Sequence, residues 1–153
     1  MAVLTGTKHG DAANDLMVFY QDEATKLAAS GSYFMAAVAL GAALETALLA
    51  FMLVEWGEDN GGELKIPATV SLDDLIDAAS EGNFDLLNAV KFRGPNGECS
   101  VQNVVRQIQI TRNNLHAGRC LRKRFNPASF SSARYEKLKA IYGAVTDNLL
   151  YHI

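Results

Sequence analysis

Residues 33 to 54 form an almost uninterrupted apolar segment, in which Glu45 and Thr46 are the only polar side chains. The pattern predicts a helix over about Tyr33 to Trp56, which is long enough to span a membrane. Seven alanines and one glycine make the segment only weakly hydrophobic, and Glu45 near its middle would be costly in lipid. We therefore expect a central helix packed closely against several neighbours, and no membrane segment.

Helical periodicity continues on both sides of this segment, and no stretch alternates between polar and apolar residues as a strand would. The sequence predicts an all-α fold, an up-and-down helical bundle of four to five main helices with one or two short extra helices. At 153 residues we expect a single domain over 1–153. The further helices are expected at about residues 11–29, 71–81, 84–92 and 131–152, and from about residue 100 to an end between residues 116 and 119.

Each expected helix has an apolar stripe that should face the core. In the short helix, Ser71 should be the N-cap and Asp74 should complete a capping box. The segment between residues 57 and 67 is rich in glycine and is expected to be a surface loop. The side chains expected to point inward are Leu16, Phe19, Tyr20 and Leu27 in the first helix, Leu72, Leu75, Ile76 and Ala79 in the short helix, Val101, Val104, Val105, Ile108 and Leu115 in the fourth long helix, and Tyr135, Leu138, Ile141, Val145 and Leu149 in the last.

Composition excludes several classes of protein. Two cysteines do not make a disulfide framework, and no group of cysteines and histidines has the spacing of a metal site. No glycine-rich phosphate loop of the Walker type is present, so we expect neither a metal nor another cofactor. The first ten residues contain no apolar segment of signal-peptide length, and a cytoplasmic location is expected.

Charge is distributed unevenly along the chain. Residues 1–90 contain 14 acidic and 3 basic side chains, a balance of −11, whereas residues 91–153 contain 11 basic and 3 acidic ones, a balance of +8. Such polarity could steer an anionic ligand to one end, or let two copies associate head to tail. The two halves could equally neutralise each other within one fold.

A motif of charged and amide side chains lies in the basic half. Arg112 and His116 are four residues apart, so on one helix they would share a face, and Asn113 and Asn114 lie between them. A permanently charged guanidinium beside a titratable imidazole is a suitable pair for binding and cleaving a phosphodiester.

Three segments, in this order, resemble the HEPN-like (higher eukaryotes and prokaryotes nucleotide-binding) family. Residues 33–45 resemble its central glutamate-bearing helix, and residues 71–79 resemble a helix between the two halves of such proteins. The run Arg112-Asn113-Asn114-Leu115-His116 resembles the Arg-Asn-x-x-x-His-type signature, with a spacing one residue shorter than the usual minimum. The resemblance implies a bacterial or phage member of this family, with a HEPN-like bundle.

The resemblance also implies a homodimer in which the signature helices pack together and line a shared cleft. Active members cut RNA there without a metal, and many are toxin or defence ribonucleases, so RNA and a cognate antitoxin or other protein partner are expected. Arg112 would then bind the scissile phosphate, His116 would move the proton, and Asn113 would position one of them. His116 is the only internal histidine, so an acid and a base would have to come from two chains.

The same residues also fit a non-catalytic helical interaction or nucleotide-binding module. A carboxylate in the core needs a partner, and Glu45 and Arg112 could form a structural pair. His116 could then stabilise a helix C-terminus. The sequence leaves both alternatives open.

A basic run follows the motif and has two possible roles. It could contact RNA phosphates, in which case binding would weaken steeply with salt, or it could meet the acidic half of a partner subunit. Phe125 and Phe130 are the only nearby aromatic residues, and we expect them to anchor the core or a loop. The four cations are Arg119, Arg122, Lys123 and Arg124.

Overall fold

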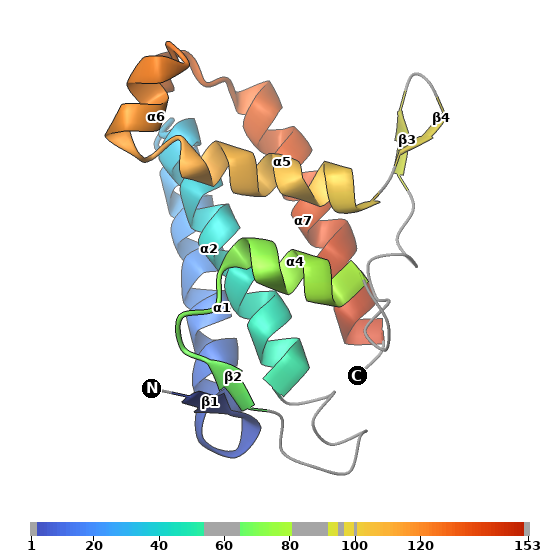
Figure 1. Ribbon diagram of the computed structural model, residues 1–153. Helices are drawn as coiled ribbons and strands as arrows, with labels where there is room; N and C mark the ends of the chain where they lie inside the picture. Colours follow the sequence, from blue (N-terminus) through green and yellow to red (C-terminus); the bar gives the residue numbers. More distant parts are fainter. Residues whose placement is uncertain (1–2, 54–64, 81–91, 95–96, 100, 152–153) are drawn as a thin grey trace.

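The computed structural model describes residues 3–53, 65–80, 92–94, 97–99 and 101–151. These residues are mostly helical, which confirms the all-α prediction. Figure 1 shows α4 and α5 running across the α1–α2 pair rather than along it. The elements in chain order are β1 (Val3–Thr5), α1 (Gly6–Ala29), α2 (Tyr33–Phe51), β2 (Lys65–Pro67), α4 (Leu72–Ser80), β3 (Phe92–Gly94), β4 (Gly97–Cys99), α5 (Val101–Asn113), α6 (Ala117–Arg122), the 3-10 helix η4 (Pro127–Ser129) and α7 (Ser132–Tyr151).

The apolar helix α2 lies at the centre and contacts α1, α4, α5 and α7. Ala36, Ala37 and Ala43 are completely buried, and their short side chains let the neighbouring helices approach closely. The length and composition of α2 would also suit a membrane span, but 61% of its most apolar window is buried inside the protein. This burial agrees with the expected core helix.

The first helix differs from its prediction in its start and in its buried face. It begins at Gly6 rather than near Asp11. Leu16 and Phe19 were expected inside but are 43% and 54% exposed. Tyr20 and Leu27 are partly buried against the core, as predicted. The side chains that complete this face are Ala13, Met17 and Ala24.

Two short antiparallel ribbons were not predicted. β1 pairs with β2, with Leu4 opposite Ile66, so the last three residues of the expected 57–67 loop form a strand. β3 pairs with β4, with Phe92 opposite Cys99. The rest of the expected 57–67 loop and most of the helix expected at 84–92 lie outside the described residues.

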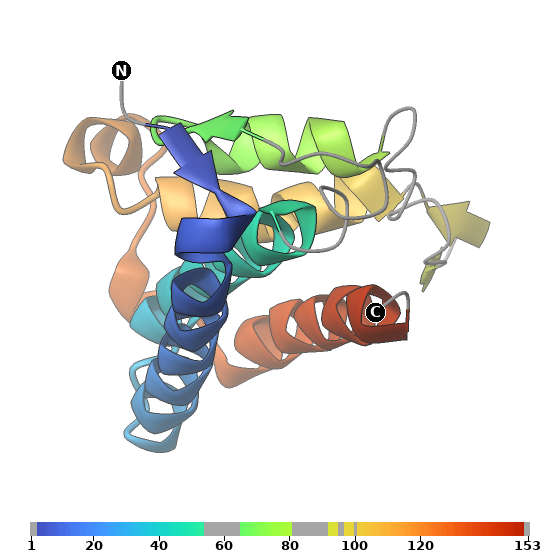
Figure 2. The ribbon, with the colours of Figure 1, turned by 90° about the horizontal axis from the view of Figure 1, so that it is seen from below.

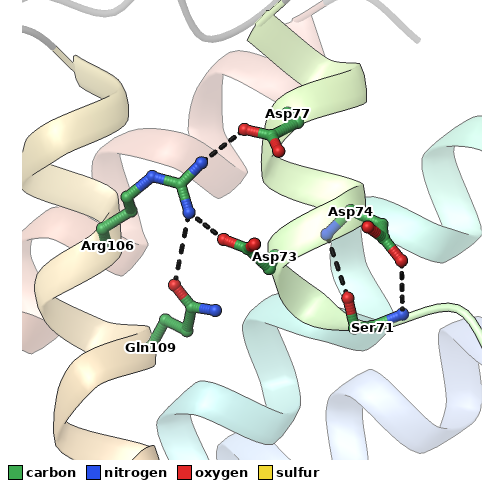
Figure 3. Close-up of polar contacts among 6 residues, drawn as sticks. All are labelled: Ser71, Asp73, Asp74, Asp77, Arg106 and Gln109. Carbon is green, nitrogen blue, oxygen red and sulfur yellow. Dashed lines mark hydrogen bonds and ion pairs between the residues drawn. The ribbon is translucent and has the colours of Figure 1, made fainter.

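The short helix α4 begins as predicted. Ser71 Oγ accepts a hydrogen bond from the backbone N–H of Asp74 at 3.1 Å, and the Asp74 carboxylate accepts one from the N–H of Ser71 (Figure 3). The four predicted inward residues of this helix are all buried. Arg106 of α5 then ties the two helices together by ion pairs to Asp73 and Asp77 (Figure 3).

The last helix α7 also follows its prediction. Tyr135, Leu138, Ile141 and Val145 are all at most 5% exposed, and the side chain of Leu149 lies outside the described residues. In α5, Val105 and Ile108 are completely buried, but Leu115 was wrongly expected inside. It lies beyond the end of α5 and is 56% exposed.

Candidate functional site

Arg112 lies in the last turn of α5 and connects this helix to α2. Its Nη1 donates a hydrogen bond to Oε2 of Glu45, and the two groups form an ion pair. The Arg112 side chain is 35% exposed and that of Glu45 is 27% exposed, so water still reaches both groups. The carboxylate in the apolar helix therefore has its counter-charge on a neighbouring helix.

Gly41, one turn before Glu45 on α2, makes room for the stem of Arg112. A Cβ atom added at Gly41 would lie 3.0 Å from Cδ and 3.1 Å from Cβ of Arg112. The arginine stem thus lies directly over the backbone of α2, and any Cβ atom at position 41 would make an unusually tight contact with it. The role of Gly41 was not predicted from the sequence, where it is one of several small residues. The Gly-x-x-x-Glu spacing on the apolar helix places Gly41 on the same face as Glu45 and could have indicated the role.

The helix ends between Arg112 and His116, contrary to the expectation that they share one helical face. Three successive N–H groups bond to carbonyls three residues back, the last being His116 N to Asn113 O at 3.2 Å. His116 then has an extended backbone, with φ −72° and ψ 118°, and is the N-cap of α6. Asn113 and Asn114 favour this end, because asparagine has a low helix propensity.

His116 is exposed, and its side chain makes no capping hydrogen bond. Its position at the start of α6 also contradicts the alternative in which it stabilises a helix C-terminus. The imidazole is therefore open to solvent at the corner between α5 and α6.

The two asparagines differ in their surroundings. Asn113, the last residue of α5, is half-buried. Asn114 is only 9% exposed, and its Oδ1 has no hydrogen-bond partner among the described residues. A buried acceptor left unpaired lowers the free energy of unfolding by about 1–3 kcal/mol, so Asn114 destabilises this corner.

The basic run occupies α6 and the turn that follows it. Arg119 is half-buried, whereas Arg122, Lys123 and Arg124 are exposed, and no ion pair involves these four cations within the part of the chain that is described. Arg124 adopts a left-handed backbone with φ 52°, which ends the helix sharply.

Aromatic residues hold this cationic segment against the core, as expected. The ring of Phe34 on α2 lies 5.2 Å from that of Phe125 and 5.9 Å from that of Phe130. The thiol of Cys120 donates to the carbonyl oxygen of Phe125 at 3.1 Å, which fixes the turn after α6. The cations are thereby presented on an ordered turn.

Within the described ranges, no group of three or more His, Cys, Asp or Glu side chains could hold a metal ion. No protein-family model matches the sequence, and neither the curated proteins nor the solved structures give a significant match. The resemblance to HEPN-like proteins therefore stays a prediction from the sequence.

Proposed function

We propose that this protein is a helical RNA-binding module whose cationic segment, Arg119, Arg122, Lys123 and Arg124, contacts RNA phosphates. The main observation in support is that three of these side chains are exposed and that none of the four forms an ion pair in the described part of the chain. The aromatic anchors hold the cations in place, which lowers the entropy cost of binding.

Arg112 has a structural role in this proposal. Its guanidinium is engaged by Glu45 and its stem lies against Gly41, so the residue joins α5 to α2 at the corner from which α6 projects. The ion pair supports the position of the cationic segment and does not itself bind the ligand.

Binding of a labelled single-stranded RNA, measured at several salt concentrations, tests this proposal. Each phosphate contact to single-stranded nucleic acid adds about −0.7 to the slope of log K against log salt. Replacing Arg122, Lys123 and Arg124 together by glutamine should therefore make the slope shallower by about 2.

A matched control removes the same number of exposed cations elsewhere on the surface: Lys8, Lys26 and Lys139 replaced by glutamine. The control should keep most of the affinity and the slope. Equal losses in both triple variants would show a general charge effect and contradict an RNA site on α6.

A second function, metal-independent RNA cleavage in a homodimer of a toxin or defence system, has one observation in its favour. His116 is exposed and the Arg112 guanidinium is partly exposed, at the corner from which the cationic segment begins. Arg112 would stabilise the phosphoryl charge, and His116 would transfer the proton during attack by the 2′-hydroxyl.

This second function requires Arg112 to leave Glu45, or to serve both partners at once. Cleavage of RNA by the purified protein in EDTA would support it, provided that Arg112→Ala and His116→Ala each abolish the activity. Cleavage that persists in both variants would come from a different site or from a contaminant.

A further inference from the structure

The outer side of α1 carries an apolar ridge with acidic neighbours. Leu16 and Phe19 are three residues apart, so they lie on one face of the helix, and they are 43% and 54% exposed. Asp15 and Asp22 are exposed on either side of Phe19 along the same helix, and neither forms an ion pair within the described residues. We refer to Asp15, Leu16, Phe19 and Asp22 as the α1 face.

A groove of about 280 Å³ lies between α5 and α7, and its apolar and basic lining complements the apolar and acidic α1 face. Ile110, Phe130 and Leu138 provide apolar surface, while Arg134 and Lys137 of α7 provide positive charge. Among the residues that the structure describes, no acidic side chain lines this groove. The Arg134 guanidinium lies over the Phe130 ring at 4.7 Å, which holds the charge at the edge of the groove. We refer to it as the α5–α7 groove.

We propose that the α1 face of one copy docks into the α5–α7 groove of a second copy. Phe19 would be the anchor, because an exposed aromatic side chain entering an apolar pocket is the usual centre of a protein interface. The volume of the groove suits one large side chain. Asp15 and Asp22 would then face Arg134 and Lys137, which aligns the two surfaces by opposite charge.

Neither surface is complementary to itself, because the α1 face is acidic and the α5–α7 groove is basic. Within one chain, Gln21 of α1 donates a hydrogen bond to Tyr142 of α7, and Phe19, two residues before Gln21, points to the opposite side of α1. The α1 face therefore turns away from the α5–α7 groove of its own chain, with α1 on the left and α7 on the right in Figures 1 and 2. The contact is therefore heterologous. A row of copies keeps a free α1 face at one end and a free α5–α7 groove at the other, so further copies can add. It uses none of the four cations assigned to RNA and does not rest on the proposed function.

Sedimentation of RNA-free protein over a range of concentrations tests the proposal. The wild type should form species larger than a dimer as concentration rises, and high salt should weaken them. Phe19→Ser and Lys137→Glu should each leave a monomer, with at least a tenfold weaker association. Both side chains are exposed, so neither change should unfold the protein.

Mixing the two variants gives the decisive result. Phe19→Ser keeps an intact groove and Lys137→Glu keeps an intact α1 face, so an equimolar mixture should form one-to-one dimers and nothing larger. A mixture that stays monomeric, or a wild type that is monomeric throughout, would overturn the proposal. A wild type that forms a discrete dimer unaffected by either change would also overturn it.

Leu121→Ser is the matched control, because Leu121 is 78% exposed and lies outside both surfaces. Its association should equal that of the wild type, and equal loss in Leu121→Ser would show non-specific apolar clustering instead. The triple glutamine variant of α6 should also associate normally, which separates this proposal from RNA binding.

Discussion

Gly41 and Arg112 meet so closely that a methyl group on Gly41 would lie 3.0 Å from Cδ and 3.1 Å from Cβ of Arg112. The Cβ atom is fixed to the backbone of α5 and cannot rotate away, so Gly41→Ala requires α2 and α5 to shift by a few tenths of an ångström. Overpacking costs about 1–3 kcal/mol, and replacing a glycine inside a helix returns about 1 kcal/mol. We expect the free energy of unfolding to fall by about 1 kcal/mol, measured by urea denaturation.

Gly143→Ala is the control for this variant. Gly143 also lies inside a helix, but a Cβ atom there would meet nothing within 4 Å. This change should stabilise the protein by up to about 1 kcal/mol. If Gly41→Ala stabilised the protein as much as Gly143→Ala, the close approach of Arg112 would not matter to stability.

The ion pair between Arg112 and Glu45 should make a moderate contribution to stability. Both side chains are about one-third exposed, so solvent screens the pair more than it would in a sealed core. In a double-mutant cycle with Arg112→Met and Glu45→Gln, we expect a coupling energy of about 1 kcal/mol. Methionine is chosen because it keeps an unbranched stem over Gly41.

The exposed pair of Lys26 and Glu23, with side chains 73% and 39% exposed, provides a reference cycle. Its coupling energy should be below about 0.5 kcal/mol. A value for Arg112 and Glu45 no larger than this reference would contradict a structural role for the pair.

The parts of the fold that follow from local chemistry could be predicted from the sequence. The apolar segment gave the central helix, the Ser71–Asp74 spacing gave the start of α4, and the periodicity from Tyr135 gave the buried face of α7. Each of these depends on residues within a single helix or its cap, so no distant contact is needed to specify it.

Other features depended on distant partners. In α1, two adjacent rows contain apolar residues, and periodicity alone could not choose between them. The row with Ala13 and Ala24 was buried because α2 is itself alanine-rich and the two helices pack closely. Strand β2 has three residues and becomes a strand only by pairing with Val3 to Thr5, so its own sequence carries too little signal.

In the candidate site, the sequence pointed to Arg112 and Glu45 as partners, and the structure pairs them. The position of His116 was missed because a four-residue spacing implies a shared face only if the helix continues. Two consecutive asparagines were the signal that it does not.

The capping box of α4 provides a third prediction. Ser71 Oγ accepts the N–H of Asp74, so Ser71→Ala leaves this donor without its partner (Figure 3). We expect the free energy of unfolding to fall by about 1 kcal/mol, and Ser71→Asp should recover most of the loss because aspartate is an equally good N-cap. Ser131→Ala would be a poor reference, because Ser131 Oγ itself accepts a hydrogen bond from the N–H of Arg134. Ser32→Ala is the better control and should cost less, because Ser32 is the N-cap of α2 but its side chain makes no capping hydrogen bond. No loss in Ser71→Ala would mean that water replaces the cap fully.

We predict that the protein loses stability in alkali because the unfolded state favours ionisation of Tyr142. Burial raises the pKa of Tyr142 to about 12, although the hydrogen bond donated by Gln21 acts in the opposite direction. A tyrosine in the unfolded chain has a pKa of about 10, so between about pH 10 and about pH 12 the folded state holds more protons than the unfolded state. Stability must then fall as pH rises through this window, by at most about 1.4 kcal/mol per pH unit.

The wild type and Tyr142→Phe, compared by urea denaturation from pH 9 upward, isolate this effect. The variant should lose less stability than the wild type above about pH 10, because phenylalanine cannot ionise. Burial also raises the pKa of Tyr135, so part of the alkaline loss should remain in the variant. Gln21→Ala removes the donor that stabilises the phenolate, and should therefore move the ionisation of Tyr142 to still higher pH, which the absorbance of the phenolate reports. Identical pH profiles for the wild type and Tyr142→Phe would show that Tyr142 ionises as easily in the folded protein as in the unfolded chain.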